Sequence, residues 1–313
     1  MKSTTKPIRE WSKDDLAEEL LYLQEVGSLV LPRNYPKLPG IDYYASIEPY
    51  RGTVGGDHVM LVNFRKYNLK QKIAEARKSG NLGLAERLEK NLDSFGILIA
   101  DVSGHMIGNN IVVNYLHGAL KTGIVYELRH KGEITQELFE IINSDLYLHL
   151  QPDLKVKPYT TMLYGEVHGD GRFRFLSAGH PPPIIFSNEF NKIQRLGSDH
   201  LKASTPLGVL PGKFSIDTEH FEPLGITNGG FDVNEIHLLG HGDIMLLYTD
   251  GLTEHKDGTS RFKDTRLENI LIETKSESAK EICETIKKEL YSFCPPEDDL
   301  TLAVIKKVHS KRQ

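Results

Sequence analysis

The stretch FGILIADVSGH, residues 95–105, runs through apolar and small side chains and then stops at a carboxylate, Asp101. An apolar run of this length, bounded by glycine, predicts a buried β-strand. An aspartate at the end of such a strand is well placed to hold a hard cation such as Mg²⁺ or Mn²⁺, whose preferred ligands are carboxylate oxygens. For a single aspartate, a turn or a helix cap is the more common role.

The same pattern recurs elsewhere in the chain. Acidic residues stand beside three further apolar runs: Asp57 before HVMLVNF, Asp250 after DIMLLYT, and Asp298 with Asp299 before LTLAVIKK. Burying these carboxylates singly would carry a large desolvation cost, so if the strands converge, a divalent cation is the simplest compensation. Two such ions ~3.5–4 Å apart can stabilise an in-line displacement at phosphorus. If the strands do not converge, the acids are independent caps and turns.

Composition limits the class of protein. The chain has 313 residues, of which 39% are hydrophobic and 26% charged, as in soluble proteins of one large or two ordinary domains. A net charge of −5 argues against a broadly basic nucleic-acid surface. Only Cys283 and Cys294 are present, too few for a disulfide framework or a thiolate zinc cluster. No signal core and no apolar run near ~18 residues occurs, so we expect a cytoplasmic protein with neither membrane nor nucleic-acid partner.

Residues 1–38 are predicted to form a polar tail followed by a linker or regulatory helix over residues 12–30. Ser12, with acids directly after it, has the character of a helix N-cap. Small or apolar residues then follow at helical spacing: Leu16, Leu20, Leu23, Gly27 and Val30. This stripe either packs on its own domain or pairs with a second protomer or a regulator, and it is too short to define a coiled coil.

Residues 39–309 are predicted to form one domain. Strands are expected in the runs IDYYASIEPY, GGDHVMLVNF, YTTMLYGEVH, RFRFLSAGH, PPIIFSN and DIMLLYTDG, and in the final run LTLAVIKK. Helices are expected over 107–123, 133–149, 265–273 and 277–293, with Ile134, Leu138, Ile141 and Leu146 forming one buried face. Residues 66–94 are highly charged and interrupted at Gly80, which predicts a solvated helical hairpin inserted between two strands. Residues 188–240 give no clear assignment.

Six stretches together carry a family resemblance. They are VGGD (54–57), IADVSGH (99–105), SAGHPPP (177–183), TPLGVLPG (205–212), LLYTDGLTE (246–254) and DDLTLAVI (298–305). Their types and order resemble the bacterial SpoIIE/RsbU branch of the PPM-type serine/threonine phosphatases, which are related to protein phosphatase 2C. The resemblance covers residues 39–308. It implies an α+β fold, a four-layer αββα sandwich of two antiparallel sheets flanked by helices, with a dinuclear metal site at one edge.

The resemblance also implies roles for individual residues. Asp57 would meet the second of two Mn²⁺ or Mg²⁺ ions, partly through water. Asp101 would bridge both ions, and the carbonyl of Val102 would be a further ligand. Asp250 and Asp298 would hold the first ion. Attack on phosphorus by water held between the ions, without a phosphoenzyme, would follow.

The chain departs from the family pattern in two places. Many relatives carry another acid three residues after the GGD aspartate, where this chain has Met60, so a third metal position is in doubt. Relatives outside the bacterial branch have a histidine two residues after the bridging aspartate as a proposed general acid, and this chain has Ser103 there.

Four other residues keep two interpretations each. His105 and His180 lie in the motifs, and we expect structural hydrogen bonding rather than acid catalysis from both. Arg51 is a candidate for binding the substrate phosphate in a bidentate manner, against the plainer role of a surface arginine. Asp299 is an alternative to its neighbour Asp298 as a metal ligand.

The expected function is a metal-dependent protein phosphatase acting on phosphoserine or phosphothreonine. Kinship suggests an anti-anti-sigma (STAS-domain) protein as substrate, within a bacterial partner-switching pathway. The alternatives are a phosphatase-fold binding module with weak or no activity, and a metallohydrolase of small phosphoesters.

Overall fold

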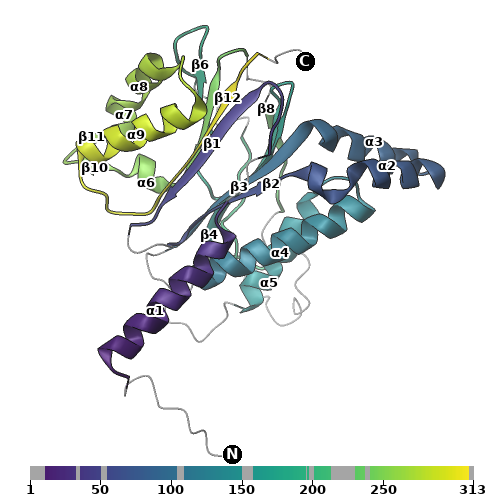
Figure 1. The fold of residues 1–313 in the computed structure, drawn as a ribbon, viewed down its shortest axis with the longest axis horizontal. Coiled ribbons are helices and arrows are strands. Elements are labelled where there is room, and N and C mark those ends of the chain that lie inside the picture. Colours follow the sequence, from purple (N-terminus) through teal and green to yellow (C-terminus); the bar gives the residue numbers. More distant parts are fainter. Residues whose placement is uncertain are drawn as a thin grey trace, which may run out of the picture.

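Two five-stranded sheets form the centre of the molecule (Figure 1). The computed structural model describes residues 11–32, 36–50, 55–103, 109–149, 158–194, 196, 201–212, 230–236 and 240–309. The first sheet has the order β1 (Ile41–Glu48), β12 (Leu300–Lys307), β9 (Ile244–Tyr248), β6 (Ile184–Ser187) and β7 (Lys192–Gln194). The second has the order β2 (Asp57–Val62), β3 (Ser94–Val102), β4 (Thr160–His168), β5 (Phe173–Ala178) and β8 (Asn234–Ile236). Neighbouring strands in both sheets are antiparallel.

Helices cover the outer face of each sheet (Figure 1). The described helices are α1 (Lys13–Gly27), α2 (Leu69–Lys78), α3 (Leu82–Lys90), α4 (Asn109–His130), α5 (Gln136–His149), α6 (Asp250–Thr253), α7 (Phe262–Thr265), α8 (Leu267–Thr274) and α9 (Ala279–Phe293), of which α1 projects away from the sheets. Short 3-10 turns η2 (Ser28–Val30), η3 (Phe64–Tyr67) and η4 (Asn91–Asp93) and the ribbon β10 (Lys256–Asp257) with β11 (Ser260–Arg261) complete the described elements. The described helices and sheets form the expected αββα sandwich.

Strand β3 shows why the motif strand is apolar throughout. Ile97 and Ile99 belong to the core between the two sheets, whereas Leu98 and Ala100 belong to the core beneath α4 and α5. Successive side chains of a strand point to opposite faces, so a strand that is buried on both faces has no polar alternation. A third core lies between the first sheet and α7–α9.

Several local predictions are confirmed. Ser12 caps α1, and Asp15 returns a bond to its backbone in a reciprocal capping box. The charged segment 66–94 forms the α2–α3 hairpin, which buries a narrow apolar stripe. The link at 169–171 joins β4 to β5 as an antiparallel pair.

One predicted buried face is partly wrong. Ile134, Leu138 and Leu146 are buried, but Ile141 is 49% exposed. Phe139 and Ile142 take its place in the core. Residues 138, 142 and 146 are spaced four apart and lie on the same side of α5, so residue 142 faces the core and residue 141 faces solvent. The unassigned stretch 188–240 also contains β7 and β8.

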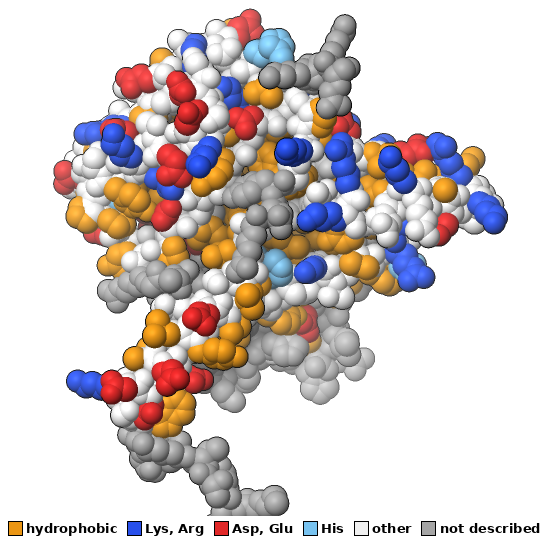
Figure 2. Space-filling model, viewed as in Figure 1, with side chains coloured by type: hydrophobic (Ala, Val, Ile, Leu, Met, Phe, Trp, Pro, Cys, Tyr) orange, Lys and Arg blue, Asp and Glu red, His pale blue; other side chains and the backbone are white. Residues whose placement is uncertain are grey.

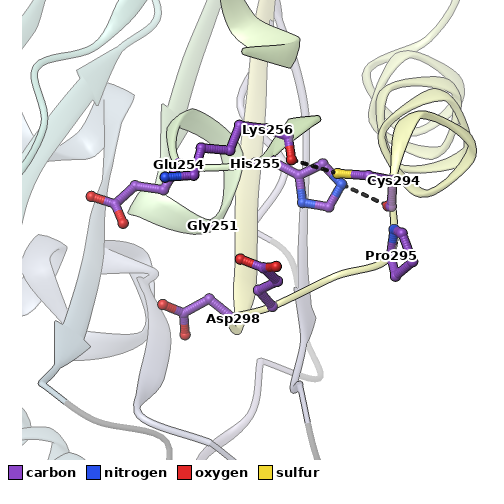
Figure 3. Close-up of a pocket in the computed structure, with 8 residues that line it drawn as sticks. Gly251, Glu254, His255, Lys256, Cys294, Pro295 and Asp298 are labelled. Carbon is purple, nitrogen blue, oxygen red and sulfur yellow. Dashed lines mark hydrogen bonds between the residues drawn. The ribbon is translucent and has the colours of Figure 1, made fainter. Parts of the chain in front are cut away.

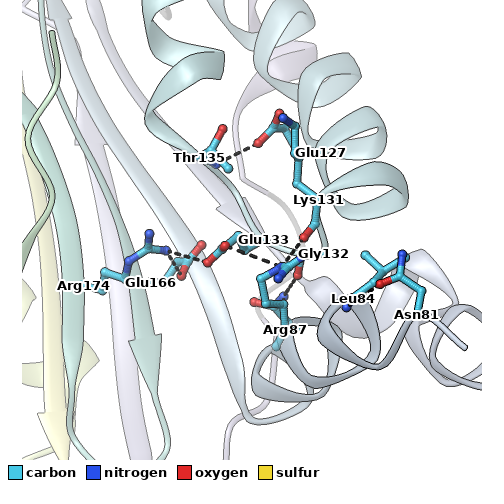
Figure 4. A network of polar contacts seen from close by, with 11 residues as sticks. Asn81, Leu84, Arg87, Glu127, Lys131, Gly132, Glu133, Thr135, Glu166 and Arg174 are labelled. Atoms are coloured by element: carbon cyan, nitrogen blue, oxygen red, sulfur yellow. Dashed lines mark hydrogen bonds and ion pairs between the residues drawn. The ribbon is translucent and has the colours of Figure 1, made fainter. Parts of the chain in front are cut away.

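An alternating chain of charges ties the hairpin to the second sheet (Figure 4). Arg174 on β5 lies 3.4 Å from the Glu166 carboxylate and 3.9 Å from that of Glu133, which lies 3.7 Å from Arg87 of α3. Glu166 is buried, and this burial raises its carboxyl pKa to about 7 against the opposing effect of Arg174. The buried acid therefore depends on Arg174 to remain ionised.

No helix among the residues that the structure describes is both long and apolar enough to cross a membrane.

Candidate active site

The antiparallel pairing of β2 with β3 places two of the predicted ligands opposite each other. Asp57, the first residue of β2, pairs with Asp101 near the end of β3. Directly opposed residues share a face, with Cβ atoms about 4.5–5.5 Å apart. The next residue along β3 is tied to the same turn, because the Val102 amide donates to the Gly56 carbonyl at 3.1 Å. Two acids separated by more than forty residues thus lie at one end of one sheet.

The first sheet reaches this pair through Thr249, the residue that follows β9. Its hydroxyl donates to Asp57 Oδ2 at 2.7 Å and accepts a bond from the Thr301 amide at 2.9 Å. Asp250 follows directly and begins α6. The hydroxyl therefore joins β2 to the ends of β9 and β12, where the remaining predicted acids lie.

Asp299 serves as a brace between the sheets. One carboxylate oxygen accepts from the Tyr50 amide at 2.6 Å and the other from the Gly56 amide at 2.7 Å. A Cβ on Gly55 would lie 2.0 Å from this carboxylate, and a Cβ on Gly251 would lie 2.1 Å from the Asp299 carbonyl oxygen. Both glycines are required because the turn before β2 and the turn after β9 close directly onto this residue.

Electrostatics at this edge disfavour an ionised Asp57 in the absence of a cation. The pKa of the Asp57 carboxyl lies well above the usual range, first because the group is buried and then because the Asp101 carboxylate is close. Asp299 raises this pKa by a smaller amount, whereas the hydrogen bond from Thr249 lowers it. A group of carboxylates that repel one another is the donor set that a hard divalent cation would neutralise. No three His, Cys, Asp or Glu side chains within the described ranges are already clustered as a metal cage. The opposed pair Asp57 and Asp101 fits a cation in its chemistry, and the described side chains do not form a closed cage around one.

The other residues that the sequence singled out make hydrogen bonds within the fold or lie outside the described residues. The Val102 carbonyl accepts from the Asn109 side-chain amide at 3.2 Å, and the Ser103 hydroxyl accepts from the Tyr159 amide at 3.0 Å. His180 is buried with Nδ1 3.0 Å from the Thr161 hydroxyl, and burial lowers its pKa to about 3. It has the character of a neutral structural histidine. Arg51 and His105 lie outside the residues that the structure describes.

A cavity of about 220 Å³ opens beside Asp298 and Gly251 (Figure 3). His255 in its wall lies with Nε2 3.0 Å from the Leu290 carbonyl and 2.8 Å from the Cys294 carbonyl. Carbonyls only accept, so Nε2 carries the proton. The imidazole thereby ties the end of α9 to the turn that follows Asp250.

Sequence reasoning missed two polar contacts at this edge. Thr249 was not identified as the link to Asp57, although it precedes Asp250 in the TDG motif. His58 is buried, its Nε2 lies 3.1 Å from His117 Nδ1, and burial together with His117 lowers its pKa to about 3. Only its adjacency to Asp57 could have indicated it.

Known proteins resemble this chain in sequence. The family model described as Stage II sporulation protein E (SpoIIE) matches residues 92–308. The phosphoserine phosphatase RsbU of Bacillus subtilis (strain 168) is 24% identical over 225 residues, which cover 70% of this chain and 57% of RsbU. The chain therefore spans little more than half the length of that relative.

Solved structures share the fold. The SiaA-PP2C domain of Pseudomonas aeruginosa superposes with a TM-score of 0.62 at 14% identity, covering 94% of this chain and 98% of that chain. The PP2C phosphatase domain of Bacillus subtilis SpoIIE, solved with a fragment of its regulatory domain, gives a TM-score of 0.56 at 16% identity over 88% of this chain and 66% of that chain. The match over residues 92–308 shows that this chain belongs to the SpoIIE family, and the solved structures show that it has the fold of PP2C phosphatase domains.

Proposed function

We propose that the chain is a Mn²⁺- or Mg²⁺-dependent protein phosphatase that hydrolyses phosphoserine or phosphothreonine on a protein. The observation that carries the proposal is the meeting of β2 and β3 with the Thr249 turn, where Asp57 lies opposite Asp101 and accepts the Thr249 hydroxyl bond. Family membership supports the reaction class, and RsbU is named a phosphoserine phosphatase.

Two divalent ions would be held by Asp57, Asp101, Asp250 and Asp298, with the Val102 carbonyl as a further ligand. When bound, such ions supply Lewis-acid polarisation of the phosphoryl group and an activated water. Asp57 would have to lose its proton for binding, and the Thr249 hydrogen bond favours that loss because it lowers the pKa of this carboxyl. Arg51 is proposed to bind substrate phosphate.

Asp298 is proposed as the ligand in preference to Asp299. Both Asp299 oxygens already accept backbone amides, from Tyr50 and Gly56. Asp298 instead lines the open cavity beside Gly251, although one of its oxygens accepts the Asp299 amide at 2.7 Å. Exchange of Asp298 would therefore affect metal binding, and exchange of Asp299 would affect folding first.

Asparagine variants of Asp101 and Asp250 test the enzyme assignment. Each keeps the side-chain size but removes the charge, so Mn²⁺-dependent hydrolysis of a phosphoprotein should fall by at least about 100-fold. Mn²⁺ titration by calorimetry should show weakened binding in the same variants. The exposed Asp264 on α7 provides the matched control, Asp264→Asn, which should behave as wild type. Wild-type rates in the Asp101 and Asp250 variants would overturn the assignment.

The substrate is proposed to be a phosphorylated STAS-type anti-anti-sigma protein in a cytoplasmic partner-switching pathway. Rates on such a phosphoprotein, on a phosphopeptide of the same site and on p-nitrophenyl phosphate should decline in that order. Equal rates on the small ester would favour a small-molecule phosphohydrolase, and binding of the phosphoprotein without turnover would favour a binding module.

Residues 1–38 are proposed to be a regulatory segment preceding a phosphatase domain at 39–309. Helix α1, within the predicted range 12–30, would act through a homodimer or a separate regulator. Its apolar side chains support this role, since Leu16, Leu20 and Leu23 are 38–46% exposed. Sedimentation of the full chain against a protein beginning at Pro39 should show association only in the former.

A further inference from the structure

Helix α1 projects from the sandwich with most of its surface uncovered (Figure 1). Only Gly27, at its C-terminal end, is buried, and it lies against Asn110 of α4. The helix contains five acidic residues and one lysine. Like charges at positions 14 and 18, and again at 15 and 19, are one helical turn apart and weaken an isolated helix. An acidic helix with exposed leucines requires a partner that is both cationic and apolar.

The α2–α3 hairpin has the opposite charge. Residues 65–93 contain eight Lys and Arg against four Asp and Glu, in a chain whose net charge is −5. Arg77 pairs with Glu89 and Arg87 with Glu133, but Lys66 and Lys70 have no ion pair with the described part of the chain. Figure 2 shows basic side chains gathered over this hairpin and acidic and apolar ones along α1. The hairpin core does not require these lysines, because its buried positions are apolar.

A groove of about 480 Å³ begins at the base of the hairpin. Its apolar floor comes from the residues that follow α1, including Leu31, and from Met60 and Leu61 of the edge strand β2. Lys66 and Lys121 stand in its wall. His117 also lines the groove; burial and then the neighbouring Lys121 lower the pKa of its imidazole, so the positive charge in the groove wall comes from the two lysines.

We propose that the acidic, leucine-bearing α1 of one copy docks in this groove and against the basic hairpin of a second copy, reciprocally. Opposite net charges on the two surfaces, together with apolar area on both, select this occupant. A polyanion such as nucleic acid fits less well, because the chain outside the hairpin is strongly acidic. The inference refines the self-association proposed above and does not depend on phosphatase activity.

Salt distinguishes this contact from a pairing of two α1 helices. Docking of α1 on the hairpin joins opposite charges, so raising NaCl from about 0.05 M to about 0.5 M should weaken the dimer about tenfold or more. Two acidic helices packed together would instead repel less in salt, and their dimer would tighten. Sedimentation equilibrium of the full chain over a concentration series measures the dissociation constant in each buffer.

A second experiment reverses the charges on the groove and on helix α1. The groove variant K66E/K121E and the helix variant E18K/E19K should each be monomeric, and their mixture should form heterodimers because both contacts are then complementary. The control K275E/K288E changes the same amount of charge on the α8–α9 side and should dimerise as wild type. Circular dichroism melts check that each variant is folded. A wild-type chain that stays monomeric, a dimer that tightens with salt, or a groove variant that dimerises normally would each overturn the proposal.

Discussion

Replacing Thr249 by valine should destabilise the protein because one hydroxyl makes two buried hydrogen bonds. Thr249 is fully buried; it donates to Asp57 Oδ2 at 2.7 Å and accepts from the Thr301 amide at 2.9 Å. Valine has the same branched shape but can make neither bond. The variant therefore leaves a buried carboxyl with one donor fewer and a buried amide without its partner.

The expected loss follows from these two contacts. An orphaned buried amide costs about 1–3 kcal/mol, and a lost hydrogen bond to a carboxyl costs about 1 kcal/mol when the acid is protonated and more when it is ionised. We expect Thr249→Val to lower the free energy of unfolding by about 2–4 kcal/mol. The variant should also need a higher pH to bind Mn²⁺, since the Thr249 bond lowers the pKa of Asp57.

Urea unfolding in the presence of EDTA, followed by circular dichroism, measures this loss without any contribution from metal. Thr249→Ser keeps the hydroxyl and serves as the control; it should lose only the effect of one methyl group, about 1 kcal/mol. A valine variant within about 0.5 kcal/mol of wild type, or a serine variant as unstable as valine, would refute the bridging role of the hydroxyl.

Two further substitutions test the packing and the electrostatics. Gly251→Ala should unfold more easily by at least about 2 kcal/mol, because its Cβ would lie 2.1 Å from the Asp299 carbonyl oxygen, a backbone atom with little freedom to move. Gly118→Ala, in open space within α4, should stabilise by about 0.5–1 kcal/mol in the same urea titration; equal effects of the two would contradict the close approach. Glu166→Gln removes a carboxyl whose pKa rises on folding from 4.5 to about 7. Because the folded protein holds this proton more tightly than the unfolded chain, the wild type loses stability relative to the variant as the pH rises from 4.5 to about 7. The total loss is roughly 3 kcal/mol. Unfolding at about pH 5 and about pH 8 measures the difference, and a pH-independent gap would show that Glu166 does not titrate in this way.

Local structure was largely predictable because it depends on neighbouring residues. The capping box at Ser12, the interruption of the hairpin at Gly80 and the apolar strand ending at Asp101 are all properties of short segments. Ile141 shows where such reasoning stops. Two apolar faces were compatible with the sequence of α5, and packing against the second sheet selected the one that contains Phe139 and Ile142.

The sequence by itself predicted which acids to expect at the centre, because each follows or precedes an apolar run in a recognisable motif. Only the tertiary structure decided how they are connected. The register of β2 against β3 places Asp57 opposite Asp101, and the Thr249 hydroxyl joins them to β9 and β12. Both carboxylate oxygens of Asp299 accept backbone amides, from Tyr50 and Gly56. These contacts join residues up to 249 positions apart, so no local pattern encodes them; they exist because two sheets bury a common core and bring their strand ends to one edge.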